Sequence, residues 1–173
     1  MAMNIDFIVA SLICFLSYAF HTLEHWFEYK GERIKLPNAL FEIILFAGYF
    51  AWGYMVYSDP VRTHFPSWIL APIGVTIGMV GLVLGWLAHR ELGNFDDPGR
   101  LVTTGVFSKM RHPFYVGMSL VHIGFPLAMQ SVLTLASAIL WIMMMYFWKI
   151  WEEKELIEKY GKEYEEYQKR TVF

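Results

Sequence analysis

Residues 67–88 read SWILAPIGVTIGMVGLVLGWLA, a run of 22 positions without one charged side chain. A helix needs about 20 apolar residues to cross the ~30 Å hydrocarbon core of a bilayer, so this stretch predicts a transmembrane helix. Gly74, Gly78, Gly81 and Gly85 recur at steps of four, three and four, which puts them on one face of that helix. Such a stripe lets a second helix approach closely, and we expect it to serve packing.

Four further apolar stretches, 5–27, 39–57, 114–129 and 131–150, have a similar character. The whole chain of 173 residues is 56% hydrophobic and only 17% charged, with a mean hydropathy of +0.37. This composition predicts an all-α polytopic membrane protein with about five transmembrane helices. The last two should form a helical hairpin, followed by an amphipathic cytoplasmic helix. We expect one integral membrane domain over 1–173, with a three-helix part at 1–88 and the loop, hairpin and tail at 89–173.

The basic residues predict the orientation. Thirteen of the fourteen lysines and arginines fall in the segments 28–38, 89–113 and 149–173, and only Arg62 lies elsewhere. Cytoplasmic loops carry such an excess, so these segments should face the cytoplasm and the N-terminus should lie outside. The first apolar stretch is too long for a signal peptide and should remain in the mature protein. The single Cys14 excludes a disulfide, and a net charge of -2 gives no support for nucleic-acid binding.

A polar motif, RHPFYVG at 111–117, precedes the fourth apolar stretch. Pro113 suits the first turn of a helix, because its ring fixes a helical φ and its missing N–H would have had no partner there. The free N–H groups of that turn favour an anion, and Arg111 and His112 add positive charge. The motif can therefore bind a ligand carboxylate or phosphate. The alternative is that Arg111 binds lipid headgroups and His112 caps the helix.

Two adjacent acids, Glu152 and Glu153, stand where the fifth apolar stretch should leave the membrane. Such acids are commonly solvated. A helical hairpin would, however, bring them close to RHPFY, and a ligand with both a cation and a carboxylate could then bind between the two elements. An amino-acid-like ligand fits this description.

Two separated segments carry a resemblance to a known family. LVTTGVFSKMRHPFYVG (101–117), followed after one hairpin by EEKELIEKYGKEYEEYQKR (152–170), resembles the isoprenylcysteine carboxyl methyltransferase family. That family belongs to a wider group of membrane methyltransferases that act on prenylated proteins, phospholipids or small thiols. The resemblance covers roughly the C-terminal 75 residues and hardly reaches 1–88.

The resemblance implies S-adenosylmethionine as the cofactor, in a cytoplasmic pocket between the first segment and the helix after the hairpin. It implies that Glu152 is the acid partner of the cofactor's amino group. The other residues that it implies around the cofactor are Leu101, Val102, Phe107, His112, Pro113, Phe114 and Tyr115.

The sequence departs from the family at three positions. An arginine that is thought to hold the substrate carboxylate is replaced by Trp148, and the neighbouring Lys149 could supply only a point charge. Gly99 and Arg100 stand where relatives have histidine and threonine. A prenylcysteine carboxylate, a lipid and a small thiol therefore all stay open as the methyl acceptor.

Methyl transfer from a sulfonium is an in-line displacement that needs no metal. A carboxylate or thiolate acceptor would need little base catalysis, whereas a lipid amine would have to lose a proton, and no residue stands out as an obligatory base. Alignment of donor and acceptor can supply ~7–11 kcal/mol, and exclusion of water adds to it. Arg111 is the predicted catalytic residue, because it could orient an anionic acceptor. The expected partners are membrane lipid and a lipophilic or prenylated substrate.

Three histidines leave alternatives open. His21 and His25 lie in HTLEHWFE (21–28), which can be a structural polar cluster, a route for substrate or a metal site. His122 shares a helical face with Tyr115 and can be a hydrogen-bonded core residue or line a tunnel. A rival enzyme class is a membrane reductase of the sterol-reductase type with a nicotinamide cofactor. A non-enzymatic rival is a membrane protein that carries haem or a metal on these histidines.

Overall fold

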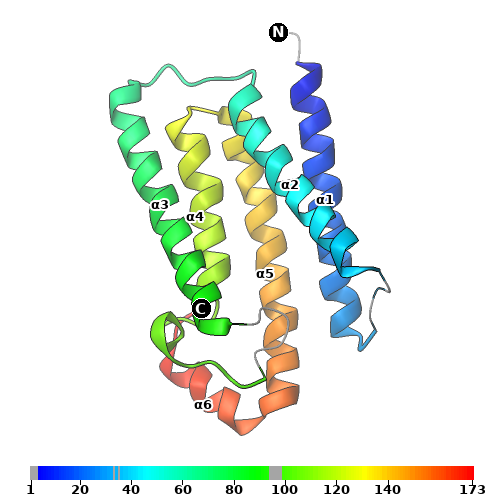
Figure 1. Ribbon diagram of the computed structural model, residues 1–173. Coiled ribbons are helices and arrows are strands. Elements are labelled where there is room, and N and C mark those ends of the chain that lie inside the picture. Colours follow the sequence, from blue (N-terminus) through cyan, green and yellow to red (C-terminus); the bar gives the residue numbers. More distant parts are fainter. Residues whose placement is uncertain (1–3, 33, 35, 94–98) are drawn as a thin grey trace.

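The computed structural model is a bundle of helices and describes all residues except 1–3, 33, 35 and 94–98. Five long helices form the bundle, and a short sixth helix closes one end of it (Figure 1). The helices are α1 (Ile5–Tyr29), α2 (Asn38–Ser58), α3 (Ser67–Leu92), α4 (Pro113–Ala128), α5 (Val132–Tyr160) and α6 (Lys162–Arg170), with a 3-10 turn, η1, at Gly105–Ser108.

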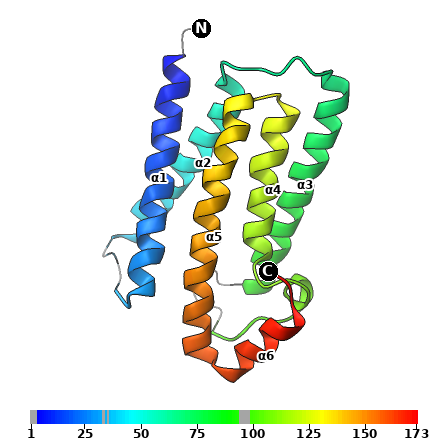
Figure 2. The same cartoon turned by 180° about the vertical axis from the view of Figure 1, so that it is seen from behind.

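The predicted all-α membrane fold is confirmed. Four helices, α1, α2, α3 and α5, are long and apolar enough to cross a membrane. The fourth predicted span, α4, has only 16 residues and is about 24 Å long, which is less than the hydrocarbon thickness. It lies between α3 and α5 in both views (Figures 1 and 2).

The glycine stripe of α3 packs against α4, as predicted. A β-carbon added to Gly124 would lie 2.6 Å from the backbone oxygen of Gly74, and one added to Gly117 would lie 2.6 Å from that of Gly81. Both distances are shorter than real β-carbons tolerate, so the two backbones touch because neither helix has a side chain there.

The core between the remaining helices is rich in aromatic residues. Tyr18, Trp141 and Trp148 are buried, and the Tyr18 ring contacts both tryptophans and the histidine of α4. His122 is fully buried, its Nε2 lies 2.7 Å from the Tyr18 hydroxyl, and its Nδ1 lies 2.7 Å from the Met118 carbonyl. The structure therefore gives His122 the role of a hydrogen-bonded core residue.

The α4–α5 hairpin is tied to the α2–α3 connection at the end of the bundle where α1 begins. The Asp59 carboxylate accepts hydrogen bonds from the Thr134 backbone N–H at 2.8 Å and from the Thr134 hydroxyl at 2.9 Å. Arg62 donates to Ser131 and to the Met129 carbonyl. Asp59 thus satisfies one of the free N–H groups in the first turn of α5.

The tail differs in one respect from the expectation of a separate helix after residue 150. α5 continues without a break to Tyr160, because no helix-breaking residue precedes Gly161. Gly161 has φ +54°, a backbone conformation that glycine adopts without strain, and there the chain turns into α6. α6 lies across the lower end of the bundle in Figure 1, and this turn brings it back toward the start of α4.

Candidate active site between α4, α5 and α6

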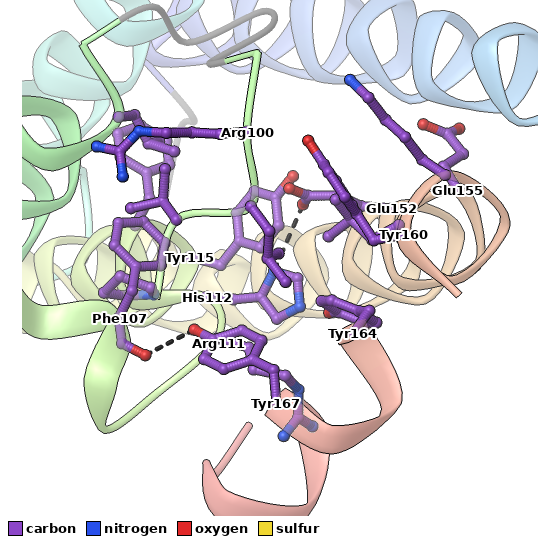
Figure 3. Close-up of a pocket in the computed structure, with 17 residues that line it drawn as sticks. Arg100, Phe107, Arg111, His112, Tyr115, Glu152, Glu155, Tyr160, Tyr164 and Tyr167 are labelled. Carbon is purple, nitrogen blue, oxygen red and sulfur yellow. Dashed lines mark hydrogen bonds and ion pairs between the residues drawn. The ribbon is translucent and has the colours of Figure 1, made fainter. Parts of the chain in front are cut away.

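A cavity lies at the α6 end of the bundle, between the loop before α4, the start of α4, the last turns of α5 and α6 (Figure 3). The structure brings all nine residues of the predicted site together around it. They are Leu101, Val102, Phe107, Arg111, His112, Pro113, Phe114, Tyr115 and Glu152. Their functions stay predictions, but the shared location agrees with a common role.

His112 lies at the centre of the site. It stands just before α4, but its side chain does not cap that helix. Instead, its Nδ1 lies 3.4 Å from a carboxylate oxygen of Glu152 and its Nε2 lies 3.3 Å from one of Glu153. Burial alone lowers the pKa of the imidazole, but the hydrogen bonds and charges of Glu152 and Glu153 outweigh burial, so the pKa is raised above its ordinary value. The two carboxylates thus stabilise the imidazolium form of His112.

The two adjacent glutamates differ in what they bind. The Glu153 side chain is only 16% exposed and is held by Arg111 at 2.7 Å and by Lys149 at 3.3 Å. The Glu152 side chain is 40% exposed, lines the cavity and interacts with His112 and with the Tyr115 hydroxyl. Glu152 is therefore the carboxylate that a ligand can reach, whereas Glu153 is committed to the protein.

Arg111 lines the cavity, but it also anchors the residues that follow α6. Besides its ion pair with Glu153, its guanidinium donates to the Thr171 carbonyl at 2.8 Å and to the Gln168 carbonyl at 3.3 Å. Its backbone N–H donates to the Phe173 carbonyl at 2.9 Å. That Arg111 orients the acceptor stays a prediction. Its structural role is to hold the end of α6 and the residues after it to the loop before α4.

The α6 side of the cavity was not among the predicted site residues. Tyr164 and Tyr167 are 1% and 2% exposed and both line the cavity, together with Tyr160 at the end of α5. The Tyr167 hydroxyl donates to the Phe107 carbonyl at 2.6 Å and so fastens α6 to η1. In the sequence, Leu156, Tyr160, Tyr164 and Tyr167 lie close to one helical face, which is compatible both with a docked amphipathic helix and with a solvated helical tail. The burial of Tyr164 and Tyr167 in the structure distinguishes the two.

The structure also places the residues at which the sequence departs from the family. Trp148 is 5% exposed, and its indole N–H donates to the Thr22 hydroxyl at 3.0 Å. The Lys149 ammonium lies 5.0 Å from the centre of the Phe173 ring, in addition to its ion pair with Glu153. Arg100 lines the cavity (Figure 3). The ammonium of Lys149 is therefore engaged by Glu153 and by the ring of Phe173, which follows α6.

The polar cluster of α1 packs on Trp148. The His25 ring stacks on Trp148 at a centroid distance of 5.2 Å, and His21 contacts the same indole at 4.9 Å. His21 Nδ1 lies 2.9 Å from the Glu24 carboxylate. Within the described part of the chain, no three His, Cys, Asp or Glu residues are grouped as a metal site would require.

Comparisons with known proteins identify the family to which the chain is similar. A family model described as "Phospholipid methyltransferase" matches residues 70–163, more than half of the chain, from α3 to the start of α6. Two sequences from Oryza sativa, of subspecies indica and japonica, are both described as "Probable protein-S-isoprenylcysteine O-methyltransferase". Each is 27% identical over 114 residues, which is 60% of this chain and 60% of the relative.

A bacterial relative is the "Nickel-cobalt-cadmium resistance protein NccN" of Alcaligenes xylosoxydans xylosoxydans. It is 31% identical over 110 residues, which cover 61% of this chain and 50% of the relative. The chain thus spans about half to 60% of the length of these relatives. No solved structure matches the chain.

Proposed function

Because the chain belongs to the phospholipid methyltransferase family, we propose that it is an integral membrane methyltransferase that uses S-adenosylmethionine. Its acceptor is an apolar or amphipathic molecule that arrives from the lipid, of the prenylcysteine carboxylate, phospholipid or small thiol class. The cavity between α4, α5 and α6 is the proposed active site.

The observation that carries this proposal is the pairing of His112 with an accessible Glu152. S-Adenosylmethionine ends in an amino acid, which has one ammonium and one carboxylate. The Glu152 carboxylate fits the ammonium. The N–H groups of the first turn of α4, next to the positive charge of His112, fit the carboxylate. The site therefore has a separate partner for each charge of a zwitterion.

The remaining walls fit the nucleoside part of the cofactor. Leu101, Val102, Phe107 and Phe114 are apolar residues of the cavity, and Val102 and Phe107 are themselves buried with Ala88 of α3. Ligand sites are mostly lined by such side chains, with few polar groups that fix the orientation. The donor set and the apolar walls together suit a nucleoside that carries an amino acid.

The bound cofactor would supply a methyl group on a positively charged sulfur. The chain has to hold the acceptor in line with that methyl group and exclude water, and alignment can supply ~7–11 kcal/mol. Glu152 and His112 fix the amino-acid end. In our proposal Arg111 orients an anionic acceptor as well as anchoring the tail.

We propose that the polar cluster of α1, which contains His21 and His25, serves the methyl acceptor. Trp148 contacts Tyr115, a residue of the cavity, at a centroid distance of 6.3 Å, and the His25 ring stacks on Trp148. A chain of aromatic contacts thus links the cavity to α1, which has many exposed apolar side chains. We propose that a lipophilic acceptor approaches along it, on the cytoplasmic side, with the N-terminus outside.

Calorimetric titration of S-adenosylhomocysteine into the detergent-purified chain tests the cofactor. Saturable binding is expected for the wild type. Glu152→Gln should weaken it by about tenfold or more, because a charged hydrogen bond contributes ~1.5–3 kcal/mol. His112→Ala should weaken it similarly. Glu158→Gln, an exposed residue of the same helix, is the matched control and should bind like the wild type.

Two results would contradict the proposal. One is the absence of binding by a folded wild-type protein, and the other is binding that neither site variant changes. If the cofactor binds, transfer of a labelled methyl group to a prenylcysteine, a phospholipid and a small thiol, each presented in vesicles, identifies the acceptor class.

A further inference from the structure

Tyr164 combines near-complete burial with an unused polar group. The residue is 1% exposed, and its hydroxyl has no hydrogen-bond partner among the residues that the structure describes. A buried hydroxyl without a partner destabilises a folded protein, and such groups are rare in native structures. The hydroxyl of Tyr164 therefore calls for a partner that the chain itself does not provide.

Tyr167 offers a direct comparison on the same helix. It lies three residues later, it is equally buried, and its ring contacts that of Tyr164 at a centroid distance of 5.8 Å. Its hydroxyl is satisfied by the Phe107 carbonyl at 2.6 Å. The missing partner of Tyr164 is thus not a general property of buried tyrosines in α6.

The position of Tyr164 shows where its partner would be. Tyr164 lines the cavity, and Figure 3 draws its side chain reaching from α6 toward His112. Burial, and then the charges of Glu153 and Glu152, raise the pKa of the Tyr164 hydroxyl above its ordinary value. The hydroxyl therefore keeps its proton at neutral pH and can donate a hydrogen bond.

We propose that the Tyr164 hydroxyl binds the carboxylate at the amino-acid end of S-adenosylmethionine, by donating a hydrogen bond to it across the cavity from Glu152. This inference rests on the proposed function. The ammonium of the amino acid can only donate hydrogen bonds, and its partner is the Glu152 carboxylate. The carboxylate can only accept, so it needs donors, and the Tyr164 hydroxyl is a donor of the site that has no partner among the described residues.

The assignment adds α6 to the binding elements of the site. The cofactor would then be held by α5 through Glu152, by the loop before α4 through His112 and by α6 through Tyr164. Binding of the cofactor would fasten α6 to the bundle, because the ligand would complete a bond that the unliganded chain lacks.

The test compares Tyr164→Phe with the wild type, using two probes. S-Adenosylhomocysteine has the carboxylate, whereas its decarboxylated analogue keeps the ammonium and lacks the carboxylate. Tyr164→Phe should bind S-adenosylhomocysteine about tenfold more weakly than the wild type does, since the lost bond is to a charged group. It should bind the decarboxylated analogue with unchanged affinity.

Thermal melting without ligand separates a binding role from a structural one. Tyr164→Phe removes an unsatisfied group, so its melting temperature should equal or exceed that of the wild type. Tyr167→Phe loses the bond to Phe107 and should melt at a lower temperature. The rise in melting temperature on addition of S-adenosylhomocysteine should be smaller for Tyr164→Phe than for the wild type.

The outcomes are distinguishable. If the wild type binds S-adenosylhomocysteine and Tyr164→Phe binds it equally well, the role of Tyr164 is overturned and the proposed function stands. Equal weakening for both probes also overturns it, because the hydroxyl would then act on another part of the ligand or on the fold. If the folded wild type binds neither probe, the proposed function fails and the role of Tyr164 fails with it.

Discussion

The guanidinium of Arg111 lies 2.7 Å from the carboxylate of Glu153, which is 42 positions later in the chain. This ion pair joins the loop before α4 to the end of α5. The same guanidinium continues to the carbonyls of Gln168 and Thr171. One side chain therefore connects three elements of the candidate site: the loop before α4, the end of α5, and α6 with the residues after it.

Arg111→Ala should lower the free energy of unfolding by about 3 kcal/mol, because it leaves the poorly exposed Glu153 carboxylate without its main partner. The tail should also become sensitive to protease. Thermal melting and limited proteolysis in detergent measure both effects. The control is Lys169→Ala, which breaks the exposed ion pair with Glu166 and should leave the melting temperature close to that of the wild type, because exposed ion pairs contribute little to stability. Unchanged melting with lost methyl transfer would assign Arg111 to catalysis alone.

Stability should fall at high pH because of His112. Its pKa in the folded protein is raised by Glu152 and Glu153 above the value of the unfolded chain. The contribution to stability is therefore fully present below the unfolded pKa, about 6.5, and is lost as the pH rises through the higher folded pKa. Melting temperatures measured between pH 5 and pH 9 check this. In His112→Gln the decline should become shallower, and an identical decline in both proteins would contradict it.

The close contact of α3 with α4 should not tolerate a methyl group. Gly124→Ala places a β-carbon 2.6 Å from the Gly74 oxygen and should destabilise the protein by about 1–3 kcal/mol through overpacking. Gly53→Ala in α2 is the matched control, since a β-carbon there meets nothing within 4 Å. It should be neutral or stabilising by about 0.5–1 kcal/mol. Similar melting temperatures for the two variants would exclude the tight contact.

Labelling of introduced cysteines measures how the chain is oriented in the membrane. His64 in the α2–α3 connection and Lys162 in α6 are both exposed and lie at opposite ends of the bundle, whereas the natural Cys14 is buried. A membrane-impermeant maleimide should label His64→Cys in intact cells. It should label Lys162→Cys only after permeabilisation, because the basic segments are expected in the cytoplasm. The reverse pattern would overturn the proposed orientation.

Much of the fold could be predicted from the sequence. The apolar stretches gave the helices, and the spacing of Gly74 and Gly81 gave the face on which α4 packs, since both patterns depend on local composition and helical period. The site residues were found together because two separated motifs share one resemblance. The resemblance selects Glu152 rather than Glu153, but the residue pattern alone does not separate them, because which glutamate faces the cavity depends on the rotation of α5.

The α6 wall was beyond sequence reasoning for a related reason. The spacing of the tyrosines indicates a buried face but not what buries it. Whether a hydroxyl meets a backbone carbonyl, as in Tyr167, or lacks a partner among the described residues, as in Tyr164, depends on how α6 packs after the turn at Gly161. The direction of that turn depends on tertiary contacts, which a local sequence pattern does not show.

The bond between Tyr167 and the Phe107 carbonyl has a consequence for biosynthesis. A ribosome makes α1 to α5 before α6, so the helical bundle can enter the membrane while one wall of the cavity is still missing. The pocket is completed only when α6 folds back onto η1. A newly inserted chain would therefore pass through a stage in which α1 to α5 are already embedded in the bilayer but the chain cannot yet bind a cofactor.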